Sequence, residues 1–253
     1  MARQIPREWL DNYTRGLTQL SEGGQRALAD ALSRIDLADR SAVAAVMRAH
    51  CMVGAKAAAE MAARFYELMS AFQTEREYDA INDSGFTATA VNNSTYSVLT
   101  EFDGNMERIL SQLLATYGRE VSRAANYNTI ANGEADERDV RYARVPSGDR
   151  TCAWCLALAG KGFHYMTREA AEHTHRGCDC RIVPEIGGSK VDVAGYRPTK
   201  YALMWNRAKR ALDSGDIPDE LKARMERERE RKGRGYGSFN EQLAVMRWMY
   251  DLK

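Results

Sequence analysis

The sequence predicts a mainly α-helical protein with an N-terminal helical bundle, a small α+β zinc-knuckle-like module, and C-terminal helices that pack back on the body. Three observations predict this order. No proline occurs between Pro6 and Pro146, and apolar residues recur there at helical spacing. Cysteine and histidine then crowd into one short segment, after which amphipathic helical patterns resume. We therefore expect three domains, residues 1–138, 139–188 and 189–253.

Long helices are expected to fill most of the first domain. The clearest runs from Ser41 to about Phe72, and small residues in its middle would let a neighbouring helix approach closely. A second long helix is expected from Asn105 to about Ile130. A shorter helix is expected to begin after Gly23-Gly24 and to carry Ala27 to Ile35. This pattern is typical of a packed bundle core.

The second domain is expected to be framed by two short strands, Val140–Val145 and Arg181–Pro184, because both runs are β-branched and bounded by turn residues. Between them, Phe163–Tyr165 could add a third strand. Thr167 is placed to cap a short helix through Glu172.

The third domain is expected to begin with a linker after Gly188 and a helix from Pro198. A charged helix follows, in which Lys222–Arg234 holds seven basic and three acidic residues, for a local charge of +4. Opposite charges alternate there, which favours a solvated helix over a nucleic-acid contact. The last helix is expected to begin at Ser238, which with Glu241 has the spacing of a capping box.

Composition is that of an ordinary globular protein and favours no particular partner. Basic and acidic residues are balanced at 36 and 35, and 44% of the residues are apolar. Neither a signal peptide nor a membrane span is indicated, so we expect synthesis and folding in the cytoplasm, with no membrane contact. In such a reducing compartment, clustered cysteines are more often metal ligands than disulfides.

The segment from Thr151 to Cys180 holds four of the five cysteines and three of the four histidines. The candidate metal ligands in this segment are Cys152, Cys155, His175, Cys178 and Cys180. The two-residue gap in the first pair lets a tight turn present two thiolates to one ion. A structural zinc takes four ligands, so one candidate is a bystander, and which four bind stays open.

A zinc ion with four protein ligands has no position for a water or a substrate, which favours a structural role and a protein that is not an enzyme. The apparent binding free energy of structural zinc, about 10 to 16 kcal/mol, is large enough to hold so short a module together. No small-molecule substrate is expected.

The segments RVPSGDRTCAWCLALAGKGFHY and HRGCDCRIVPE resemble the module shared by the phage Mu F-like minor head proteins, also called phage head-morphogenesis or minor capsid proteins. The resemblance covers Arg141–Glu185, about a fifth of the chain, and its pattern pairs the Cys-x-x-Cys with the later His-x-x-Cys-x-Cys. The chain departs from many relatives at Arg176, Gly177 and Asp179.

The resemblance implies a structural virion component made in few copies. It implies association with the phage portal protein and the head interior during head morphogenesis, with capsid or scaffold proteins as further partners. Contact with packaged double-stranded DNA, where it occurs, is expected to be nonspecific.

Two alternatives compete with this interpretation. A metal-dependent nuclease needs a histidine general base and an open metal position, and only His164 and His173 remain for the base. A nonspecific DNA-binding zinc protein is the other alternative, but the helix expected at Arg168–Glu172 is too short to fill a major groove.

Overall fold

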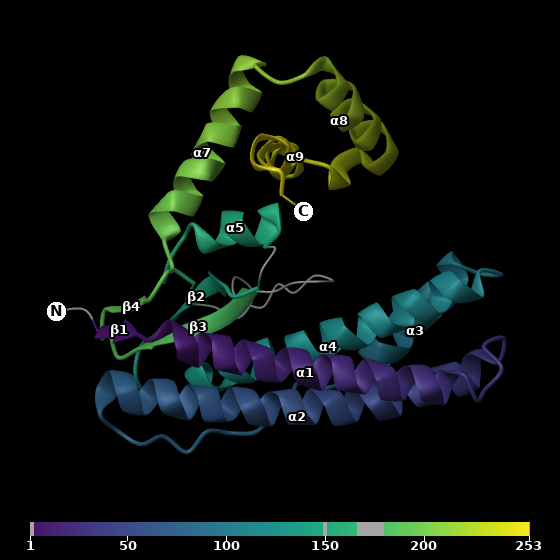
Figure 1. The fold of residues 1–253 in the computed structure, drawn as a ribbon, viewed down its shortest axis with the longest axis horizontal. Coiled ribbons are helices and arrows are strands. Elements are labelled where there is room, and N and C mark those ends of the chain that lie inside the picture. The colour runs from purple at the N-terminus through teal and green to yellow at the C-terminus, as the bar shows by residue number, and fades with distance from the viewer. Residues whose placement is uncertain (1–2, 149–150, 166–179, 253) are drawn as a thin grey trace.

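The computed structural model describes residues 3–148, 151–165 and 180–252, and these are mainly helical, as predicted (Figure 1). Its elements are, in order, β1 (Arg3–Ile5), α1 (Arg7–Leu32), α2 (Arg40–Thr74), α3 (Ala88–Glu101), α4 (Met106–Ala135), β2 (Val140–Pro146), α5 (Ala153–Ala159), β3 (Cys180–Ile186), β4 (Val191–Val193), α7 (Pro198–Ser214), α8 (Asp219–Lys232), the 3-10 turn η1 (Gly233–Gly235) and α9 (Ser238–Tyr250).

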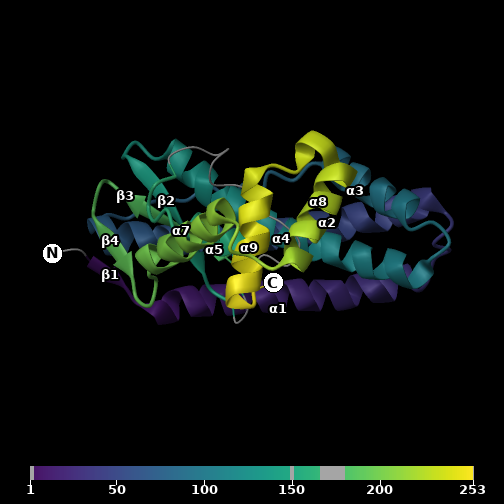
Figure 2. The ribbon, with the colours of Figure 1, turned by 90° about the horizontal axis from the view of Figure 1, so that it is seen from above.

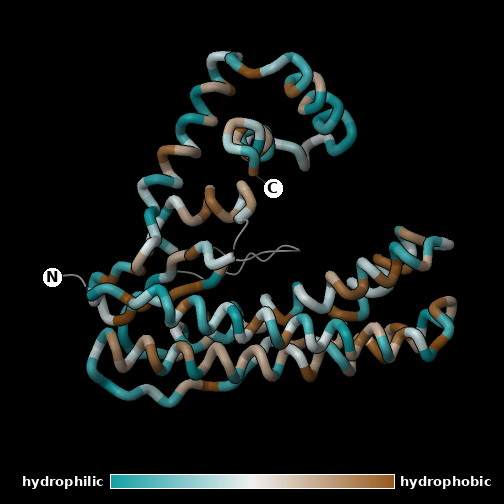
Figure 3. Tube along the Cα trace, in the orientation of Figure 1, coloured by the Kyte–Doolittle hydropathy of each residue, from teal (hydrophilic) through white to brown (hydrophobic). Residues whose placement is uncertain are grey.

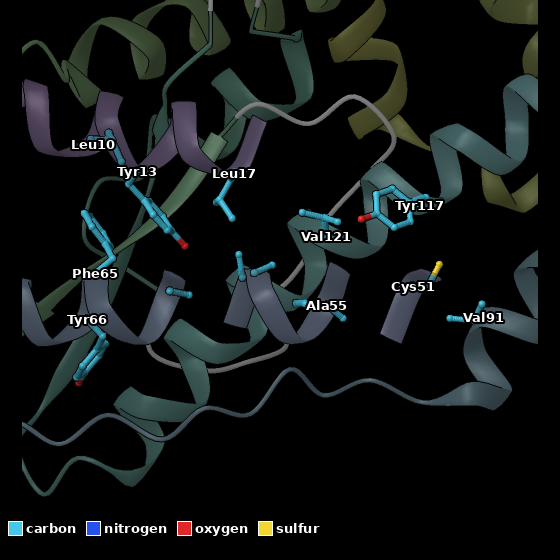
Figure 4. Close-up of a cluster of buried hydrophobic side chains, with 14 of the residues drawn as sticks. Leu10, Tyr13, Leu17, Cys51, Ala55, Phe65, Tyr66, Val91, Tyr117 and Val121 are labelled. Atoms are coloured by element: carbon cyan, nitrogen blue, oxygen red, sulfur yellow. The ribbon is translucent and has the colours of Figure 1, made fainter. Parts of the chain in front are cut away.

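The long helices α1, α2 and α4 lie side by side and form the bundle, with α3 packed at one end (Figures 1 and 2). Tyr13 of α1 stacks on Phe65 of α2 with ring centroids 4.4 Å apart, and both lie in the main core (Figure 4). The small residues predicted in the middle of α2 do allow a close approach. A Cβ built on Gly54 would lie 2.5 Å from the hydroxyl oxygen of Tyr117 on α4, so a larger residue there would displace the Tyr117 ring.

The prediction of a short helix after Gly23-Gly24 is wrong, because α1 runs without a break from Arg7 to Leu32. Glycine weakens a helix interior, so the pair by itself predicts a helix boundary. Packing is the reason for the difference. A Cβ on Gly24 would lie 1.8 Å from the Tyr117 hydroxyl oxygen, so this position must lack a side chain for α1 and α4 to meet.

Residues 75–87 form neither a helix nor a strand, although the sequence predicts a helical domain over residues 1–138. Polar side chains of α4 hold this segment by its backbone. Asn132 accepts from the amide of Ile81 at 2.8 Å and donates to its carbonyl at 3.0 Å. Asn128 donates to the Ile81 and Asp83 carbonyls at 2.8 and 3.1 Å. The two asparagines are buried one helical turn apart, and their side chains give the backbone of this irregular segment the partners that a helix or a sheet would otherwise supply. Apolar periodicity does not reveal such contacts.

Strands β2 and β3 pair antiparallel, from Val140 opposite Ile186 to Pro146 opposite Cys180, which confirms the two strands that were expected to frame the cysteine segment. One face of this two-stranded sheet, which we call the hairpin although residues 147–179 separate its strands, joins the main core through Ala143, Val145 and Val183. Ile186, at the end of β3, also belongs to that core. The other face carries Tyr142 and Ile182, which pack with Ile130 and Tyr165. The third strand is reduced to a single bridge, Tyr142 to Tyr165.

Gln73, at the end of α2, fastens the hairpin to the bundle. Its buried amide donates to the Pro184 carbonyl at 2.8 Å and accepts from the Ile186 amide at 2.8 Å and the Ser189 hydroxyl at 2.9 Å. The Gln73 side chain therefore supplies hydrogen-bond partners for two backbone groups of β3, the Pro184 carbonyl and the Ile186 amide.

A partly buried ion pair lies at the same corner. Asp136, just after α4, accepts from the Arg138 guanidinium at 2.5 and 2.7 Å and from the Tyr66 hydroxyl at 2.8 Å. Burial would raise the pKa of Asp136, but these hydrogen bonds outweigh it and hold that pKa below its usual value. Arg138 also donates to Thr74 and Ser70 of α2. The ends of α2 and α4 are thus joined where β2 begins.

The expected linker after Gly188 contains a strand, because β4 pairs in parallel with β1 from Arg3 opposite Val191 to Ile5 opposite Val193. The N-terminal residues therefore lie beside a segment near position 190 (Figure 1). Three-residue strands carry too little periodicity to be predicted.

The helix from Pro198 is confirmed, and α7, α8 and α9 pack with α5 into a second core. This unit stands on the opposite side of the hairpin from the bundle (Figure 1), and α8 is mostly hydrophilic (Figure 3). The prediction of a capping box at Ser238 is wrong. Helix α9 begins at Ser238, but its N-cap residue is Gly237, and no side chain makes a capping hydrogen bond. Glu241 instead accepts from Arg229 of α8 at 3.0 Å. Glu241 thus forms an ion pair with the neighbouring helix α8 and does not cap its own helix.

Gln73→Leu should destabilise the fold by about 2 to 5 kcal/mol, because it leaves two buried backbone groups without their partner. The free energy of unfolding in urea measures this. Gln19→Leu, on the exposed side of α1, is the matched control and should change stability by less than about 0.5 kcal/mol. Equal effects of the two substitutions would contradict the role given to Gln73.

Candidate metal-binding cysteine site

The first cysteine pair lies at the start of a helix and not in the tight turn that the sequence predicted. Cys152 is the residue before α5, and its sulfur accepts a hydrogen bond from the backbone amide of Cys155 at 3.4 Å. This is the bond that an N-cap side chain makes to the first turn of a helix. The alanine- and leucine-rich run Ala153–Ala159 has the high helix propensity that explains the difference.

The hairpin brings the third cysteine to the same place. Cys180 opens β3, and its side chain packs against Cys155, with Cys152 and Trp154 packed around the two. Cys155 is 0% exposed and Cys180 is 1% exposed. Three of the five predicted ligands therefore gather in one buried cluster, which we call the cysteine cluster and which lies between α5 and the end of the hairpin.

A buried arginine completes these surroundings. Arg144 of β2 is 0% exposed, and its Nη1 donates to the sulfur of Cys180 at 3.2 Å. The guanidinium carbon lies 5.4 Å from the centre of the Trp154 ring, in a cation–π contact. Because arginine keeps its charge in proteins, this part of the cluster favours negative charge on sulfur.

Tyr165 packs near the cluster as a neutral donor. Its hydroxyl donates to the Leu158 carbonyl at 2.8 Å, and burial raises its pKa to about 12, although the charge of Arg144 acts in the opposite direction. The Tyr165 ring therefore packs against Tyr142 and Ile182 of the hairpin, and its hydroxyl does not titrate near neutral pH.

Two of the predicted ligands, His175 and Cys178, lie outside the described residues, as does the short helix expected from Thr167 to Glu172. Among the residues that the structure describes, no group of three or more histidine, cysteine, aspartate or glutamate side chains is arranged to hold a metal ion. The zinc-knuckle-like module is thus not supported by the described part of the chain. The five-residue ligand set and the three domain boundaries stay predictions.

Sequence reasoning missed Arg144 and Trp154. A signal for the first was present, since Arg144 stands between Ala143 and Val145 in a strand that is otherwise apolar over its second half. A charged residue in such a run is buried only with partners, so it marks a polar site. Trp154, between two cysteines, gave no comparable sign.

A family model described as VG15 protein matches residues 4–208. The chain belongs to the VG15 family. The matched region contains the bundle, the hairpin, α5 and the first part of α7, and therefore the whole cysteine segment. Helices α8 and α9 lie beyond it.

Two curated relatives of this chain come from mycobacteriophages. The Gene 15 protein of Mycobacterium phage D29 is 28% identical over 120 residues, which are 34% of this chain and 43% of that protein. The Gene 15 protein of Mycobacterium phage L5 is 27% identical over 157 residues, or 44% of this chain and 50% of that protein. The chain thus spans half the length of these relatives or less. No solved structure matches.

These matches identify a phage protein, which confirms the broader part of the resemblance drawn from the sequence. The family shown is VG15, and membership of the Mu F-like proteins is not established by it. No helix in the described ranges is long and apolar enough to cross a membrane.

Cys155→Ser should loosen residues 141–165 and 180–185 while leaving the bundle formed, because it buries a hydroxyl in a space shaped for sulfur, at a cost of about 1 to 3 kcal/mol. Hydrogen exchange resolved along the chain measures this. Cys51→Ser is the matched control, since Cys51 is equally buried but lies in the bundle core. It should loosen α2 and spare the hairpin, and the same exchange pattern in both variants would be inconsistent with the placement of Cys155.

Proposed function

We propose that this VG15-family protein is a non-enzymatic structural protein of a tailed phage, a minor capsid protein that acts in head morphogenesis. The observation that carries the proposal is the phage family match, which spans the bundle and the cysteine segment together. The Mu F-like motif within that segment gives the more specific role. We place the protein in the virion, with the portal protein and the capsid or scaffold proteins of the head interior as its partners.

We further propose that a structural zinc ion joins α5 to the β2–β3 hairpin. Cys152, Cys155 and Cys180 supply thiolates, the ligand type that structural zinc prefers, and His175 or Cys178 would complete the four. The buried contact between Cys155 and Cys180 supports this fit, because it brings together two sulfurs from distant parts of the chain. Zinc bound by four protein ligands has no position left for a substrate, so its contribution is to stability.

The surface of the C-terminal helices supports a protein partner ahead of DNA. Residues 189–253 carry 15 basic and 10 acidic side chains, against 21 and 25 in the rest of the chain. On α8, however, the charges are largely paired. Hydrogen bonds from Arg231 and Lys232 lower the pKa of Glu228 to about 2, and Arg229 pairs with Glu241. Any contact with packaged DNA would therefore be weak and nonspecific.

Protein purified without chelators should contain close to one zinc ion per chain, as measured by elemental analysis. Cys155→Ser should lose most of the metal and Cys51→Ser should keep it, because only the former removes a proposed ligand. Wild-type protein free of zinc, nickel and iron would refute the metal site while leaving the structural role open.

The role itself is tested by a mass-spectrometric inventory of purified virions and procapsids. We expect the protein in both, in few copies per particle, and co-purifying with the portal protein after the shell is disrupted. Lysate of infected cells is the control for expression. Detection in the lysate but in neither particle would contradict the assignment to the head.

A further inference from the structure

The N-terminal half of α2 has an apolar face that the described part of the chain leaves exposed to solvent. Ala45, Ala49, Met52 and Val53 recur at helical spacing, and all four are exposed. Val53 at 67% and Met52 at 52% are the two most exposed large apolar side chains among the described residues. We call these four residues the α2 face. Contiguous exposed apolar residues, unlike scattered ones, mark a surface that another molecule covers.

Helix α3 extends this surface without adding charge. It packs beside the same half of α2, where Arg48 donates to the Asn92 side chain at 2.9 Å. From Ala88 to Thr100 the helix has no charged residue, although 28% of the whole chain is charged. Depletion of charge distinguishes the centre of a protein interface from the rest of a protein surface. The outer side of α2 and α3 therefore has the composition of a protein interface and lacks the basic residues that DNA would require.

We propose that the α2 face binds a second copy of this chain, with the two α2 helices antiparallel. Ala45 and Val53 lie four positions before and after Ala49, so a two-fold axis at Ala49 places the small residue of each copy opposite the larger residue of the other. Alanine at the axis lets the two helices approach closely. Because both copies use the same face, the contact closes into a dimer. This inference does not depend on the role in the phage head.

The charges at the two ends of the α2 face favour the antiparallel orientation. Residues 36–40, before the face, contain two aspartates and one arginine, for a net charge of −1. Residues 54–64, after it, contain Lys56 and the ion pair between Glu60 and Arg64, for a net charge of +1. An antiparallel pair brings the acidic end of each copy to Lys56 of the other, whereas a parallel pair would bring like charges together.

A dimer formed in this way leaves the rest of the molecule accessible. Helix α2 lies at the edge of the bundle, and the unit formed by α7, α8 and α9 lies on the far side of the molecule from it (Figure 1). Each copy would therefore keep its C-terminal unit free for a further partner. The dimer could bind that partner through two equivalent surfaces, which increases its avidity.

Sedimentation velocity of the full chain over a range of concentrations tests the proposal. We expect a mass that approaches two chains as the concentration rises to about 100 µM, because a small interface binds weakly. Ala49→Arg should raise the dimer dissociation constant at least about 10-fold, since it places two like charges at the axis. Ala71→Arg is the matched control, because Ala71 is exposed on the same helix outside the α2 face. It should dimerise like the wild type.

Circular dichroism checks that Ala49→Arg folds, which we expect because Ala49 is exposed and arginine is a good helix former. Val53→Lys is the second variant should the first unfold. A wild-type protein that stays monomeric at about 100 µM would overturn the proposal. An Ala49→Arg protein that dimerises like the wild type would also overturn it. A monomeric wild type whose binding to portal or capsid protein is lost in Ala49→Arg would assign the face to that partner instead.

Lys56→Glu tests the orientation. In the antiparallel dimer it places a second acidic group beside the acidic end of the other copy, and the dissociation constant should rise about 3- to 10-fold. Added salt should weaken the wild-type dimer and strengthen this variant, because salt screens an attraction in the first and a repulsion in the second. A dissociation constant that the substitution leaves unchanged would overturn the antiparallel arrangement.

Discussion

The docking of the β2–β3 hairpin on the end of the bundle is the constraint on which the rest of the structure depends. One face of the hairpin is part of the bundle core, and Gln73 satisfies its outer backbone groups from α2. The hairpin in turn brings Cys180 to Cys155 and gives α5 its support. A two-stranded ribbon is marginal alone, so the bundle is what makes this short sheet a stable base for the cysteine cluster.

Much of the helical architecture could be predicted from the sequence, because apolar residues recur at helical spacing over long parts of α2, α4 and α7. What failed were inferences from single residues. Gly24 was interpreted as a helix boundary and is instead a contact point for Tyr117, and Ser238 was interpreted as a cap. In both places a partner distant in sequence decided the local structure, and periodicity within one helix cannot reveal such a partner.

The candidate site was predictable in its residue types but not in its local geometry. The spacing of Cys152 and Cys155 fits a turn and also fits the first turn of a helix. The helix propensity of Ala153–Ala159 and the apolar contacts of α5 together favour the helix. Arg144 illustrates the opposite case. The apolar residues beside it in β2 are a signal of burial that the sequence analysis did not use, and the sulfur that Arg144 contacts belongs to a residue 36 positions later in the chain.

Helix α5 links the cysteine cluster to the C-terminal unit. Cys155 faces the hairpin, while Ala153, Leu156 and Ala157 of the same helix pack in the core formed with α7 and α9. A seven-residue helix has little stability of its own, so its apolar face must be covered for Cys155 to hold its place. The VG15 match ends within α7, whereas α9, which also packs against the apolar face of α5, lies beyond the match. The geometry of the cysteine cluster therefore depends on residues outside the matched region. A chain truncated near residue 208 would expose the apolar face of α5 to solvent and would no longer hold Cys155 in place.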